Sequence, residues 1–102
     1  MDESKVQELK SKHGELVAYE VGGQTVAFRR PNRVDYSRFK KEAFKEELRH
    51  TAADNLAISC LVYPDRDAFN AIWDRFPTVV DKAANDLIEL MGSEESIKKK
   101  QL

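Results

Sequence analysis

The segment that decides the fold is ELVAYEVGGQTVAFRR, residues 15–30. Apolar and polar residues alternate in its two halves, which is typical of strands with one buried face. Gly22 and Gly23 separate the halves, and adjacent glycines accept the positive φ angles of a two-residue turn. The segment is therefore predicted to form a β-hairpin, which ends at Pro31 because proline cannot donate to a strand ladder.

A lone hairpin is marginally stable in water, so other elements must cover its apolar face. Apolar residues at helical spacing fill most of the remaining chain. The fold class is predicted to be α+β and mainly helical: a short N-terminal helix, one hairpin and a bundle of about three to four helices. The expected helices cover residues 4–12 before the hairpin and 33–50, 51–62, 65–76 and 78–91 after it. Residues 1–92 are expected to form one domain, and the polar residues 93–102 a disordered tail.

Capping residues mark several helix starts in this scheme. Asn32 or Asp35 is expected to cap the helix that follows the hairpin. Thr51 followed by Asp54 resembles a capping box, and Thr78 is expected to cap the last helix. The apolar stripe predicted for the helix over 33–50 consists of Tyr36, Phe39 and Ala43.

The chain has 102 residues, of which 41% are hydrophobic and 34% charged, and its net charge is −1. That average hides a basic segment, residues 29–50, with a net charge of +4, and an acidic segment, residues 65–95, with −5. Solvated helix faces would explain this distribution, and so would two complementary faces that meet in self-association. The near-neutral total argues against a protein devoted to binding nucleic acid.

Few side chains in the chain could carry catalysis. Cys60 lies on the apolar stripe of its predicted helix, which favours a buried structural thiol. His13 and His50 have no second His or Cys at metal-ligand spacing. We therefore expect no enzyme activity, no metal site and no cofactor.

The two C-terminal helices carry many large apolar residues for so small a domain. Either all of them are core, or part of the stripe is an interface with a partner. The longest apolar runs are too short for a membrane span.

The order of motifs resembles the tail assembly chaperones of long-tailed bacteriophages, over about residues 5–95. The resemblance rests on KHGEL before the hairpin, FRRPNRVDYSRFK after it, then LVYPDRDAFNAIWDRFP and MGSEE. Its most specific features are Arg29-Arg30-Pro31 before a helix with Tyr36 and Phe39, and the Tyr63-Pro64-Asp65 junction followed by Phe69 and Phe76-Pro77. Such proteins often continue Pro-Gly-Leu after the second junction, whereas this chain has Pro77-Thr78-Val79.

The resemblance implies a non-catalytic chaperone that binds and shields the tape measure protein and assists assembly of the tail tube. It implies a location in the host bacterial cytoplasm and absence from the mature virion. The expected partners are the tape measure protein, the tail tube protein and further copies of the chain. The residues expected to bind the client or another copy are Trp73, Phe76, Val80, Leu87 and Met91. The residues expected to form an electrostatic face are Arg29, Arg30 and Arg33.

Two other functions stay open on the sequence. One is a small phage or prophage regulator that binds DNA through the basic stretch after the hairpin. The other is a module that binds and inhibits another protein.

Overall fold

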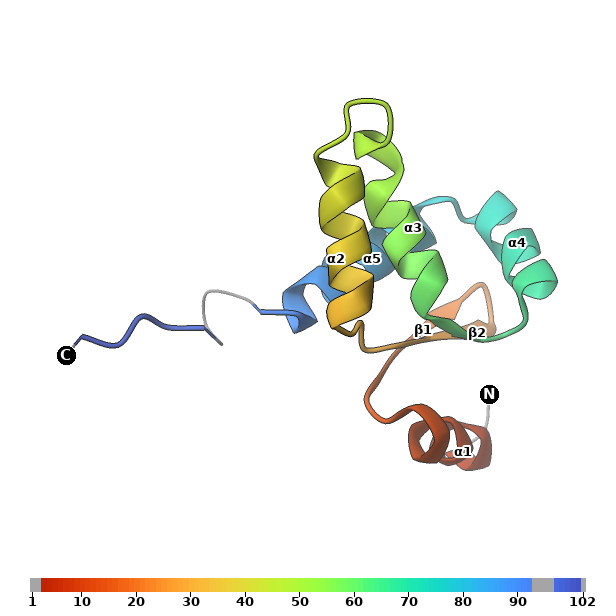
Figure 1. The fold of residues 1–102 in the computed structure, drawn as a ribbon. Helices are drawn as coiled ribbons and strands as arrows, with labels where there is room; N and C mark the ends of the chain where they lie inside the picture. The colour runs from red at the N-terminus through yellow and green to blue at the C-terminus, as the bar shows by residue number, and fades with distance from the viewer. Residues whose placement is uncertain (1–2, 93–96, 102) are drawn as a thin grey trace.

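The computed structural model describes residues 3–92 and 97–101 (Figure 1). The elements are α1 (Glu3–His13), β1 (Leu16–Val21), β2 (Gln24–Arg29), α2 (Arg33–Ala43), η1 (Arg49–Thr51), α3 (Ala52–Cys60), β3 (Leu61–Tyr63), α4 (Arg66–Arg75) and α5 (Thr78–Leu90). The predicted class is confirmed: the fold is α+β and mainly helical, with an N-terminal helix, a hairpin and a helical bundle. None of the helices in the described residues has both the length and the apolarity to cross a membrane.

The hairpin forms as predicted, with β1 and β2 antiparallel and Val21 opposite Gln24 at the turn. Gly22 has φ +58° and Gly23 has φ +81°, so both positions favour glycine. Gly22 also lies against the ring of Phe76, since a Cβ atom there would come within 2.6 Å of the Cε2 atom of Phe76. The turn therefore depends on glycine for two separate reasons.

The prediction of helix as far as residue 62 is wrong beyond Cys60. Leu61 has an extended backbone, with ψ 126°, and begins β3, which pairs antiparallel with β2. A residue that precedes proline favours extended conformations, and Pro64 restricts Tyr63 in this way. The second edge of β2 then supplies hydrogen-bond partners for the extended segment, which completes a sheet of order β1-β2-β3.

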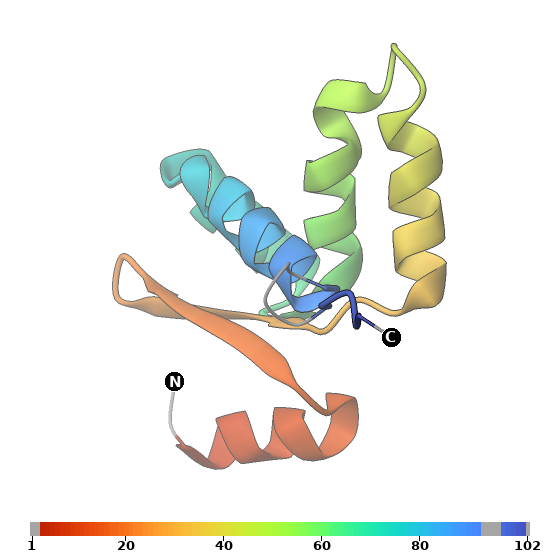
Figure 2. The ribbon, with the colours of Figure 1, turned by 90° about the vertical axis from the view of Figure 1, so that its left-hand side faces the viewer.

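Helices cover both faces of the sheet (Figure 2). α1 lies on one face, and the remaining helices lie on the other. Val26 and Phe28 belong to the main core, and the side chain of Ala27 between them points to the opposite face. Ala27 and Leu9 of α1 are both buried, whereas Ala18, opposite Ala27 on β1, is exposed, so α1 covers only part of this face.

The main core lies between the sheet and the helices α3, α4 and α5. The rings of Phe28 and Phe69 meet edge to face, with centroids 5.9 Å apart and planes at 90°. This geometry is favourable for aromatic pairs. The other large side chains that are fully buried are Val26, Val80, Leu87 and Cys60.

α2 begins as predicted and ends earlier than predicted. The Asn32 side chain accepts a hydrogen bond from the Asp35 backbone N–H, and the Asp35 carboxylate accepts one from the Asn32 N–H. Both expected capping residues thus act together as a capping box. The helix ends at Ala43 rather than at residue 50, and a turn followed by η1 carries the chain into α3. Figures 1 and 2 show α2 and α3 side by side.

Of the other two predicted caps, Thr51 does hold the N-cap position of α3 but without a capping hydrogen bond, and Thr78 is not a cap. Thr51 makes no capping hydrogen bond, because its hydroxyl donates instead to the Leu48 carbonyl oxygen at 3.1 Å. Pro77 holds the N-cap position of α5, and Thr78 is the first residue of the helix.

The predicted tail, residues 93–102, falls partly outside the described residues, which omit 93–96 and 102. Residues 97–101 form neither helix nor strand.

Candidate protein-binding site

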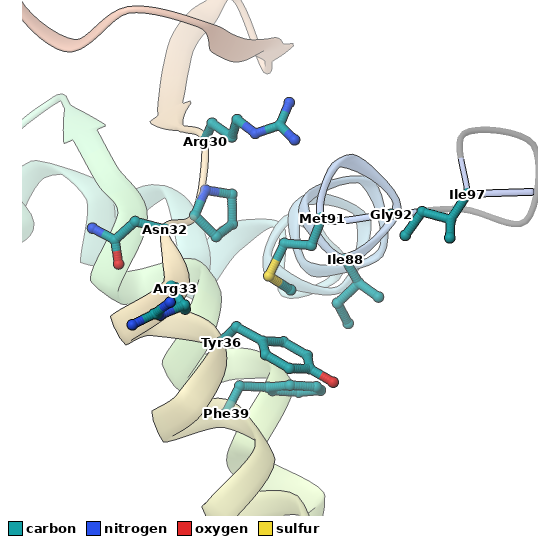
Figure 3. A pocket seen from close by; sticks show the side chains of 10 residues that line it. Arg30, Asn32, Arg33, Tyr36, Phe39, Ile88, Met91, Gly92 and Ile97 are labelled. Carbon is teal, nitrogen blue, oxygen red and sulfur yellow. The ribbon is translucent and has the colours of Figure 1, made fainter.

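A groove lies between α2 and the C-terminal end of α5 (Figure 3). Its volume is about 630 Å³. The apolar side chains that line it are Pro31, Tyr36, Phe39, Ile88 and Met91. Arg30, Asn32 and Arg33 line the end of the groove at the start of α2, and Gly92 and Ile97 line the end beyond α5. A mostly apolar groove with the Arg30 cation at one end suits a partner that is itself amphipathic.

Tyr36 and Phe39 form the α2 side of the groove. They lie one turn apart on the helix, and their ring centroids are 6.5 Å apart with planes at 39°. Tyr36 is 45% exposed and Ile88, across the groove, is 36% exposed. The predicted core stripe of α2 is therefore only partly core, and its Tyr36 end faces the groove.

An ion pair anchors the start of α2, the helix that carries the rings of Tyr36 and Phe39. Arg29 Nη1 donates to Asp35 Oδ2 at 2.7 Å, and Arg29 Nη2 donates to the Ser59 carbonyl oxygen at 3.1 Å. Asp35 is buried, and the Arg29 guanidinium holds the pKa of its carboxyl below the ordinary value. The expectation that Arg29 belongs to an electrostatic face is wrong, because its charge is used inside the fold.

The other two arginines of the predicted face lie on the surface. Arg30 Nη1 donates to Glu15 Oε2 at 3.0 Å, and this exposed pair contributes little to stability. Arg33 makes no ion pair within residues 3–92 and 97–101. Figure 3 shows Arg30 extending toward the α5 side of the groove, whereas Arg33 points away from it.

The five residues expected to bind the client lie in different places. Val80 and Leu87 are fully buried in the core, so the fold removes them from any contact surface. Trp73 and Phe76 are half-buried and pack against the same core. Met91 alone among the five lines the groove. The sequence-based choice of these residues as one shared surface is therefore wrong in this fold.

The groove residues that sequence reasoning missed are Pro31, Tyr36, Phe39 and Ile88. Helical spacing identified Tyr36 and Phe39 as apolar, but spacing does not tell which part of a stripe a neighbouring helix covers. Ile88 is one of the large apolar residues of the last helix for which the sequence leaves core and interface both open. Only the packing of α5 against α3 leaves it at the edge of the groove.

Reactive groups are few in the part of the chain that the structure describes. Cys60 is buried, and burial raises the pKa of its thiol to about 11. The Tyr19 hydroxyl donates to Asp86 Oδ2 at 2.6 Å, and burial together with this bond raises the pKa of the phenol. Within the same residues, no group of three or more His, Cys, Asp and Glu side chains could hold a metal ion.

In a comparison with known protein families, residues 9–100 match the family model described as "Domain of unknown function (DUF6848)". A solved structure of the uncharacterised protein rbstp2171 from Bacillus stearothermophilus is also similar, with 29% sequence identity and a TM-score of 0.69. The similarity covers 93% of this chain and 99% of that one, so the two folds correspond over nearly their whole length. No curated protein matches the chain in sequence.

Proposed function

The chain belongs to the DUF6848 family of domains of unknown function, and we propose that it is a non-catalytic tail assembly chaperone of long-tailed bacteriophages that binds the tape measure protein. The observation that carries the proposal is the apolar groove between α2 and α5, which is open to solvent at Tyr36 and Ile88. The choice of client rests on the resemblance of the motif order over residues 5–95.

The chemistry of the groove suits the apolar face of a client helix. Such a helix inserts large side chains at one-turn intervals, and the groove offers two aromatic rings on α2 opposite aliphatic side chains on α5. The groove would cover the apolar side chains of the client helix. This cover would keep a long helical client from aggregating before tail tube subunits surround it. Arg30 extends along the edge of the groove, where a carboxylate beside the client's apolar stripe would compete with Glu15 for its guanidinium.

In this role the protein acts in the host bacterial cytoplasm, and it leaves the client before the virion is complete. The tail tube protein is its expected second partner.

Co-purification with the tape measure protein of the same genome tests the proposal. The tagged wild-type chain is expected to retain the client, and Ile88→Asp and Met91→Asp are each expected to release it, because a carboxylate would enter the apolar groove. Ala68→Asp is the matched control, since Ala68 is exposed in the first turn of α4, outside the groove. Retention of the client by both groove variants, with native circular dichroism, would contradict the proposal.

A further inference from the structure

The outward face of α2 is strongly basic and carries two exposed apolar side chains. Val34 is 67% exposed and Phe44, at the C-terminal end of the helix, is 77% exposed. The cations exposed beside Phe44 are Lys40, Lys41 and Lys45. Arg33 lies at the groove instead, and Arg38 donates to Ser59 Oγ on α3 at 3.3 Å. A shallow hollow of about 490 Å³ lies there between Phe44 and the lysines. This face is separate from the client groove.

No acidic side chain of α2 neutralises these cations on its outward face. The Asp35 carboxylate is buried against Arg29, and Glu42 accepts a hydrogen bond from the Asn55 side chain on α3 at 2.8 Å. Glu46 and Glu47 lie in the turn beyond the helix. An amphipathic basic face of this kind, open to solvent, favours an acidic partner with room for an aromatic ring.

The outward ridge of α4 has the opposite charge. Asp67, Ala71 and Asp74 are exposed and follow one another at intervals of four and three residues, so they lie along one line. Neither aspartate forms an ion pair with any residue in the described ranges. The neighbouring cations are engaged, since Arg66 donates to Asn70 and Arg75 lies 5.5 Å from the Phe76 ring centre.

The two surfaces belong to helices that are not neighbours in the fold. Figure 1 shows α2 at one side and α4 at the other, with α3 between them. One copy therefore cannot bring its own α2 face to its own α4 ridge. Two copies can make this contact. The pair then still has one free α2 face and one free α4 ridge, so further copies can add and an open head-to-tail chain forms.

We propose that the outward face of α2 in one copy docks on the outward ridge of α4 in the next copy. Phe44 packs on the small side chain of Ala71, and the lysines that flank Phe44 meet Asp67 and Asp74. The charge complementarity of the two surfaces selects a second copy as the partner. This inference goes beyond client binding, because no groove residue takes part in the contact.

A charge-swap experiment tests the contact. Wild-type protein is expected to self-associate in sedimentation equilibrium at low salt and to dissociate as salt is added. The variants K41E/K45E and D67K/D74K are each expected to weaken self-association by at least about tenfold, because like charges would face each other. An equimolar mixture of the two variants is expected to restore it, because every contact in an alternating chain then pairs opposite charges. K10E/K12E on α1 is the control for net charge and is expected to associate like the wild type.

Three results would overturn the proposal. The first is wild-type protein that stays monomeric at every concentration and salt. The second is association of K41E/K45E as strong as that of the wild type, or a mixture that fails to restore association. The third is binding of duplex DNA by the wild type but not by K41E/K45E, with the protein monomeric throughout. That result would assign the α2 face to nucleic acid. If both charge-swap variants still co-purify with the tape measure protein, the groove binds its client independently of self-association. Failure of the self-association proposal is then distinguishable from failure of the client-binding proposal.

Discussion

Arg29 Nη1 lies 2.7 Å from Asp35 Oδ2, and this ion pair joins the end of β2 to the start of α2. The same carboxylate accepts the Asn32 backbone N–H, so one buried group completes both the helix cap and the ion pair. Arg29 also reaches the Ser59 carbonyl oxygen near the end of α3. Three elements therefore depend on one arginine, and the groove wall on α2 takes its orientation from this junction.

Arg29→Met is expected to lower the free energy of unfolding by about 3 kcal/mol. The substitution leaves the Asp35 carboxylate buried without its cation, and the loss lies at the lower end for a broken buried pair because Arg29 keeps some exposure. Urea unfolding followed by circular dichroism measures the change. Arg30→Met is the matched control, since it breaks the exposed pair with Glu15 and should cost less than about 1 kcal/mol. Equal losses of unfolding free energy in the two variants would show that the Arg29–Asp35 pair contributes no more than the exposed Arg30–Glu15 pair.

The stability of the fold is expected to fall in acid partly through Asp35. Its pKa lies below the ordinary value of 3.8, so its ionised form stabilises the fold above that pH. This contribution is lost as the pH falls from 3.8 through the lower pKa of the folded state. Asp35→Asn should therefore flatten the decline of unfolding free energy below pH 3.8. An unchanged acid slope in the variant would contradict this.

Ionisation of Asp54 is expected to destabilise the fold, whereas ionisation of Asp35 stabilises it. Burial, and then the charge of Asp81, raise the pKa of the Asp54 carboxyl above 3.8. The ionised form is therefore unfavourable in the folded state at neutral pH, and protonation in acid relieves this. Asp54→Asn should raise the free energy of unfolding at pH 7 and make its decline toward acid steeper. Urea titrations at several pH values measure both effects, and a less stable variant at pH 7 would contradict the sign.

The hairpin turn offers a matched pair of glycine substitutions. Gly22→Ala and Gly23→Ala each force a positive φ on a side chain, which costs about 1 kcal/mol. Gly22→Ala also drives a methyl group into the Phe76 ring, whereas a Cβ at Gly23 meets nothing within 4 Å. Gly22→Ala should therefore be the more destabilising, and the difference should shrink in a Phe76→Leu background. Identical thermal denaturation midpoints for the two single variants would contradict the contact.

The thiol of Cys60 is expected to be inert in the folded protein. It is buried, and its pKa of about 11 leaves it protonated at neutral pH. A thiol reagent such as dithionitrobenzoate should react only as fast as the protein opens, and immediately in denaturing urea. Rapid labelling of the native protein would place the side chain at the surface instead.

The parts of the fold that could be predicted from the sequence depend on neighbours along the chain. The glycine pair at 22–23 predicts the turn because the required φ angles belong to those residues alone. Asn32 and Asp35 predict the start of α2 because a capping box spans three residues. β3 could not be predicted in this way, because its pairing with β2 joins residues far apart in sequence.

The candidate site was less predictable, for a similar physical reason. Periodicity showed that Val80 and Leu87 are apolar and share a stripe with Met91, but burial depends on which helices cover the stripe. The end of α5 passes beyond α3 and beside α2, so Met91 reaches the groove while the other two do not. In the same way, the positive charge of Arg29 is visible in the sequence, and its engagement with Asp35 is visible only in space.

β3 has a consequence for how the chain tolerates change in length. Because Leu61 pairs with Phe28, the chain that leaves the sheet after β2 returns to it at nearly the same point. The helical pair α2–α3 is thus an excursion whose two ends are held together by the sheet. Adding residues to the turn after Ala43 costs only the slowly growing entropy of a longer loop, and it leaves the strand pairing untouched. Homologues are therefore expected to vary most in length at the tip of this excursion, while the spacing from β1 to β2 stays constant.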